Sequence, residues 1–82
     1  MDLPDCTEAI YNYWNDITEE ERMDLLPAMC DVIDAAEKMR HESTLMQSKY
    51  HREQFSKMRS RFYIESDALI RRCEAIWGED GP

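Results

Sequence analysis

The segment from Ala28 to Trp77 contains neither proline nor glycine. These two residue types are the strongest local breakers of helices, so their absence predicts helix over the whole segment. A single straight helix of that length would measure about 75 Å. A helix that long is stable in water only when another helix covers its apolar face.

A coiled coil would be one way to cover such a helix, but the heptad pattern is incomplete. Phenylalanine, leucine and isoleucine recur every seven residues, whereas the partner positions hold the charged residues Glu65 and Arg72. We therefore expect the chain to fold back on itself, with a turn near residues 40–44. The apolar series that recurs consists of Phe55, Phe62, Leu69 and Ile76.

Charge is arranged in blocks that suit this reversal. Residues 1–37 carry eleven acidic side chains and one basic one, whereas residues 38–61 carry seven basic and two acidic ones. Residues 62–82 carry five acidic and two basic side chains, and the net charge of the chain is −8. Folding back near the middle would lay the acidic arm beside the basic arm.

Local start and stop signals predict three helices within one domain, residues 1–82. The first helix is expected at about residues 5–15, the second at about 18–40, and the third at 43–77, followed by a frayed tail at 78–82. The predicted fold class is all-α, with a short N-terminal helix plus a long antiparallel helical hairpin. The core of so small a domain is worth only about 3–5 kcal/mol, so we also expect two copies to form a homodimer.

Three positions mark the expected helix boundaries most clearly. Thr18 and Glu21 match a capping box, in which each side chain accepts a hydrogen bond from the other residue's backbone N–H. Thr44 and Gln47 match a second, weaker capping box at the start of the third helix. Pro27 predicts a kink in the second helix, or a new helix start, because its ring clashes with the preceding turn.

The cysteines favour an intracellular, reducing location, which we take to be the cytoplasm. Cys6, Cys30 and Cys73 are odd in number and contain no CxxC pair, so we expect no disulfide framework. Cys30 and Cys73 fall on apolar stripes and are expected to be small core residues. The apolar runs are too short to cross a membrane, and the acidic N-terminal segment is unlike a signal peptide.

No pattern in the chain predicts catalysis, a metal or a cofactor. His41 and His51 are ten positions apart and cannot share a helix face at ligand spacing. The two glycines lie at the C-terminal end, so no glycine-rich loop is available to hold a phosphate. We therefore expect a protein that is not an enzyme.

The aromatic and methionine content indicates a protein partner. Trp, Tyr and Met are enriched at protein interfaces, and this chain has more of them than a small core can enclose. We expect a non-catalytic interaction module, a small inhibitor or adaptor that binds and redirects a host protein. In size, acidity and lack of a catalytic motif it resembles virus and phage accessory proteins. The expected anchors are Tyr11, Trp14, Tyr63 and Trp77, and the residues expected to give charge selectivity are Arg52, Arg59 and Arg61.

The alternative is a regulator linked to nucleic acid. Residues 49–61 interleave basic and aromatic side chains, which is typical of surfaces that bind single strands. The acidic face of residues 16–37 could instead mimic DNA and occupy a basic cleft. The net charge of −8 argues against direct binding of nucleic acid, so a protein partner is preferred.

Overall fold

The structure, a computed structural model, describes residues 3–82 and confirms the all-α prediction. That part of the chain holds three α-helices and one short 3₁₀ helix, and it contains no strand. The elements are α1 (Cys6–Tyr13), the 3₁₀ helix η1 (Trp14–Asp16), α2 (Glu19–Ser43) and α3 (Lys49–Trp77).

The first residues of α2 confirm the predicted capping box. The Thr18 hydroxyl accepts a hydrogen bond from the Glu21 backbone N–H at 3.1 Å. In return, a Glu21 carboxylate oxygen accepts one from the Thr18 backbone N–H at 2.8 Å. Three glutamates in this first turn also place negative charge at the positive end of the helix dipole.

Helix α2 continues through Pro27 without interruption, so no new helix begins there. Pro27 is exposed, while Leu25 and Ala28 on either side of it are buried. Proline has no N–H, so the carbonyl four residues earlier, at Met23, has no donor from within the helix. Packing of the buried neighbours against the core offsets this loss.

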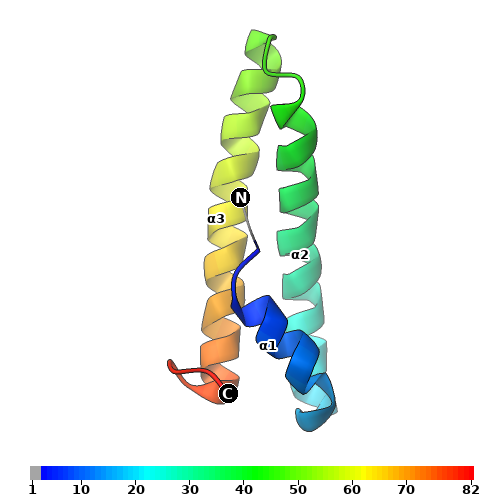
Figure 1. Cartoon of the computed structure of the whole chain (residues 1–82), viewed down its shortest axis with the longest axis vertical. Helices are drawn as coiled ribbons and strands as arrows, with labels where there is room; N and C mark the ends of the chain where they lie inside the picture. Colours follow the sequence, from blue (N-terminus) through cyan, green and yellow to red (C-terminus); the bar gives the residue numbers. More distant parts are fainter. Residues whose placement is uncertain (1–2) are drawn as a thin grey trace.

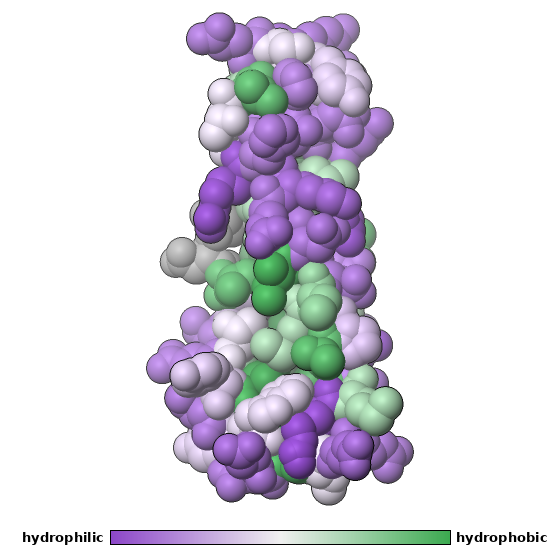
Figure 2. Space-filling view, turned by 90° about the vertical axis from the view of Figure 1, so that its right-hand side faces the viewer, coloured by the Kyte–Doolittle hydropathy of each residue, from purple (hydrophilic) through white to green (hydrophobic). Residues whose placement is uncertain are grey.

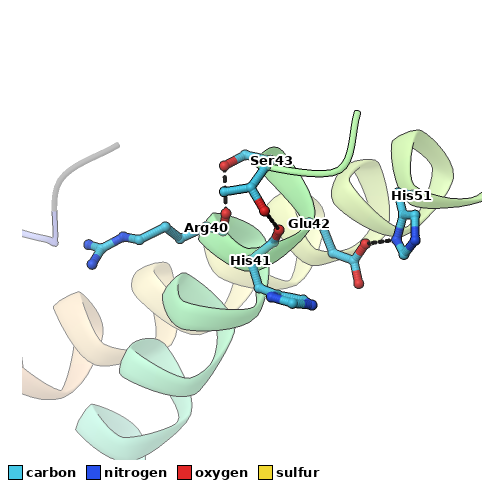
Figure 3. A network of polar contacts seen from close by, with 6 residues as sticks. Arg40, His41, Glu42, Ser43 and His51 are labelled. Atoms are coloured by element: carbon cyan, nitrogen blue, oxygen red, sulfur yellow. Dashed lines mark hydrogen bonds and ion pairs between the residues drawn. The ribbon is translucent and has the colours of Figure 1, made fainter. Parts of the chain in front are cut away.

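The turn between α2 and α3 lies later than the sequence predicts. Helix α2 extends to Ser43 instead of residue 40, and α3 begins at Lys49 instead of residue 43. The Ser43 hydroxyl donates to the Arg40 carbonyl at 2.6 Å (Figure 3). The Thr44 hydroxyl donates to the His41 carbonyl at 2.7 Å. Both hydroxyls thus satisfy carbonyls at the end of α2, so Thr44 ends α2 and does not begin α3.

Helices α2 and α3 lie side by side, and α1 crosses them at the end remote from the turn (Figure 1). The molecule measures 46 × 20 × 16 Å. Phe62 and Leu69 from the apolar series on α3 are buried, and Phe55 and Ile76 pack against the core from its edge. The buried hydrophobic residues are Ile10, Ile17, Leu25, Ala28, Val32, Ala35, Met39, Phe62, Leu69 and Cys73.

Three polar contacts join α2 to α3 at the margin of this core. Arg61 donates to the Asp34 carboxylate at 3.0 Å, and Arg72 lies 3.5 Å from the Asp24 carboxylate. Near the turn, the His51 ring contacts the Glu42 carboxylate (Figure 3). Of these pairs, only Asp34 with Arg61 joins the acidic N-terminal block to the basic middle block.

Candidate functional site

Where α1 crosses α2 and α3, an open hollow of about 570 Å³ lies between α1, η1 and α2. Ile10 fixes α1 here because its side chain is fully buried in the core. The Tyr13 and Trp77 rings, with centroids 6.4 Å apart, hold the end of α1 against the end of α3. The hollow is lined by Ile10, Tyr11, Asn12, Trp14, Asn15, Leu26 and Met29.

Large apolar side chains are exposed beside this hollow. Tyr11 is 84% exposed, and on α2 Met23 is 69% and Leu26 is 53% exposed. Cys30 and Ile33 continue the exposed series along the same helix. Figure 2 shows apolar side chains gathered at mid-height on the α2 side of the molecule, with hydrophilic side chains above and below. We call Met23, Leu26, Cys30 and Ile33 the α2 patch.

The structure brings together two of the four predicted aromatic anchors. Tyr11 and Trp14 both line the hollow beside the α2 patch. Trp77 lies instead in a separate depression near Cys6 and Cys73, and Tyr63 is exposed on α3 with its ring against Phe62. The four aromatic residues therefore do not form one surface.

Two of the three predicted arginines are engaged within the chain. Arg52 donates to the carbonyls of Met46 and Gln47 at 3.0 and 3.2 Å, and so holds the turn together. Arg61 is bonded to Asp34, as described above. Arg59 lies at the edge of a groove of about 350 Å³ between α2 and α3, where its guanidinium bonds to no other residue of the described range.

The sequence did not separate the α2 patch from the core. It predicted Cys30 as a core residue, whereas the structure exposes it, and Cys73 is buried as predicted. The apolar residues of α2 cover more of the helix surface than α1 and α3 can occupy. The spacing of Met23, Leu26, Cys30 and Ile33, in steps of three and four residues, is the sequence signal that could have identified the patch.

Two of the three thiols have raised pKa values. Burial raises the pKa of the Cys73 thiol to about 12, and it also raises the pKa of the neighbouring Cys6 thiol. Protonated thiols are poor nucleophiles and poor metal ligands. Within residues 3–82, no three His, Cys, Asp or Glu side chains are grouped so that they could hold a metal ion. In the same range, no helix is long and apolar enough to span a membrane.

Comparison with known proteins gives no relative from which a function could be transferred. No protein-family model, curated protein or solved structure matches this chain.

Proposed function

We propose that this chain is a non-catalytic protein-binding module, an inhibitor or adaptor that acts by contact alone. Its binding surface consists of the α2 patch and the adjoining hollow that contains Tyr11 and Trp14. The single observation that carries the proposal is the exposure of the α2 patch on a helix whose other face already supplies the core. Large contiguous apolar patches on the surface of a small protein are typical of interaction sites.

The balance of buried and exposed side chains supports this proposal. Within residues 3–82, ten residues form the buried hydrophobic core, whereas twelve large hydrophobic side chains are exposed. Each square ångström of apolar surface removed from water contributes about 25 cal/mol, so a partner that covers the patch gains binding free energy. Tyr and Trp are also the residue types that most often anchor interfaces.

Two further parts of the proposal concern the state of the molecule. We propose that the antiparallel hairpin closes within one chain, because Arg52 holds its own turn through two carbonyls. The homodimer expected from the sequence stays a prediction. The odd number of cysteines favours a reducing compartment, and we keep the cytoplasm as the expected location.

The nucleic-acid alternative has less support. Arg52 and Arg61, two bases of the 49–61 segment, are engaged with the turn carbonyls and with Asp34. On the acidic side, Asp24 and Asp34 are paired with arginines of α3. Both charged faces thus use part of their charge within the chain.

A pull-down from the native host with matched variants tests the proposal. Leu26→Asp places a charge in the patch, and Ile64→Asp places the same charge at an exposed apolar residue of α3 (69% exposed). We expect wild type and Ile64→Asp to retain a common partner, and Leu26→Asp to lose it at least tenfold. Circular dichroism must show that both variants remain helical. Equal retention of every captured protein by the two variants would contradict the proposal.

A further inference from the structure

We propose that the α2 patch binds an amphipathic helix of a partner protein, and that lysines or arginines border the apolar stripe of this helix. The inference rests on the proposed function and names the kind of partner. It follows from the spacing of the patch, from the charge at its ends and from the hollow beside it.

The spacing along α2 is that of a helix-packing seam. The patch and the two glutamates that end it follow one another in steps of four, three, four, three and four residues, the repeat by which one helix lies along another. The apolar part, from Met23 to Ile33, extends about 15 Å along the helix, which is three turns. The series is Glu19, Met23, Leu26, Cys30, Ile33 and Glu37.

The seam is separate from the core. The core side of α2 is formed by Leu25, Ala28, Val32, Ala35 and Met39, all buried. The patch residues lie on another flank of the same helix and are exposed. Helix α2 therefore has two distinct apolar faces. One packs against α3, and the other has no partner within the described chain.

Charge at the seam indicates a basic partner. Glu19 and Glu37 close its two ends, and Glu20 lies next to the first of them. None of the three forms an ion pair within residues 3–82, whereas nearby Lys38 is paired with Asp34 at 3.1 Å. A helix with Lys or Arg at both ends of its apolar stripe would supply the missing charge.

The same charges disfavour a second copy of this chain as the occupant. Antiparallel pairing of two copies centred on Ala28 would set Glu19 against Glu37 of the copy. Parallel pairing would set Glu19 against Glu19. Both arrangements place like charges together at the ends of a short seam, which penalises self-association at this face.

The hollow next to the seam suits an anchor side chain of the partner helix. Trp14 and Met29 line the hollow with apolar surface, and the side-chain amides of Asn12 and Asn15, which also line it, can form hydrogen bonds with polar atoms. Recognition of a helix by a groove commonly combines such an anchor with a stripe at helical spacing. A Leu or Phe one turn from the stripe would enter the hollow beside Tyr11.

Synthetic helical peptides test this inference by fluorescence anisotropy. The first has leucines at the seam positions and lysines at the flanking positions. The second has glutamates in place of the lysines, and the third has the composition of the first in scrambled order. We expect the first peptide to bind at least tenfold more tightly than either of the others, and its affinity to fall as salt rises.

Variants of the protein assign the contact. Leu26→Asp and Ile33→Asp should each lower the affinity of the protein for the lysine peptide at least tenfold. Ile64→Asp should leave this affinity unchanged. Glu19→Gln combined with Glu37→Gln should reduce the preference for lysine over glutamate without removing binding. Equal affinity for all three peptides would overturn the inference. So would a particle of twice the 9.8 kDa chain mass that Leu26→Asp converts to monomer, because a second copy would then occupy the seam.

The two proposals fail in different ways. If a host partner is captured through Leu26 but the peptides show no preference for lysine, only the basic-helix inference is wrong. If neither a host protein nor a peptide depends on Leu26, the proposed function itself is wrong.

Discussion

The Ser66 hydroxyl lies on the core face of α3, 8% exposed, and has no hydrogen-bond partner among the described residues. A buried polar group without a partner costs about 1–3 kcal/mol. We expect Ser66→Ala to raise the free energy of unfolding by up to about 1 kcal/mol in urea denaturation, since it removes the unsatisfied oxygen. Ser60→Ala, on the exposed side of α3, is the control and should change stability by less than about 0.5 kcal/mol. A less stable Ser66→Ala would contradict this account.

The Thr18 cap offers a second measurement at the scale of one residue. Thr18→Ala removes the acceptor for the Glu21 N–H and should lower the free energy of unfolding by about 1 kcal/mol. Ser48 also precedes a helix but makes no capping hydrogen bond through its side chain. Ser48→Ala should therefore have a smaller effect in the same urea titration. Equal losses in the two variants would mean that the capping box contributes nothing.

The three thiols should react at two different rates. Cys30 is exposed, whereas burial holds the pKa of Cys73 at about 12 and raises the pKa of Cys6. With a disulfide reagent at pH 8 we expect one fast thiol and two slow ones, and three fast thiols in urea. Cys30→Ser should remove the fast phase. Three fast thiols in the folded protein would show that Cys6 and Cys73 are not protected.

At the scale of the element, the sequence predicted those features that depend only on residues close together in the chain. The capping box at Thr18 needs only residues within one turn, so its position was predictable. Thr44 could bond backward into α2 or forward into α3, and only the path of the turn settles which. The α2 patch was not separated from the core because the position of α3 decides which apolar flank of α2 is buried. The contact of Arg61 with Asp34 was not predictable from local sequence, because the two residues are 27 positions apart.

The contacts of Asp34 on α2 with Lys38 and with Arg61 on α3 should make the stability of the fold depend on pH. Hydrogen bonds from Lys38 and Arg61 lower the pKa of its carboxyl below 3.8 in the folded protein. Folding therefore favours the ionised form, and the stability it contributes is present above about pH 4 and is lost as the pH falls through the lowered pKa. In an NMR titration, Lys38→Gln should raise the Asp34 pKa toward 3.8 by more than Arg61→Gln does.

The matching stability measurement uses the carboxyl itself. Asp34→Asn cannot titrate, so its stability should fall less steeply than that of the wild type when the pH is lowered below 4. Asp80→Asn, in the exposed C-terminal tail, is the control and should keep the acid dependence of the wild type. If the stability of Asp34→Asn falls below pH 4 as steeply as that of the wild type, the ionisation of Asp34 does not contribute to the stability of the fold.

At the scale of the whole molecule, the apolar surface of the helices falls into two parts, a buried core and an exposed flank of α2. One face of α2 and one face of α3 form the core, and α1 covers its end. The flank of α2 beside α1 is left exposed together with Tyr11. A core of this size supplies only about 3–5 kcal/mol, so a partner bound at the exposed flank would also stabilise the fold by mass action.

Small-angle X-ray scattering over a concentration series tests the proposal that the hairpin closes within one chain. The Cα radius of gyration is 14.5 Å, whereas a straight helix over residues 28–77 would be a rod of about 75 Å with a radius of gyration of roughly 22 Å. We expect a mass near 9.8 kDa and a radius of gyration close to the smaller value at low concentration. A doubled mass with a much longer particle would mean that the helices exchange between two chains, because each chain must then open its turn at residues 44–48.

A doubled mass in a compact particle would instead support the predicted homodimer of closed hairpins. Leu26→Asp would then show whether its interface includes the α2 patch.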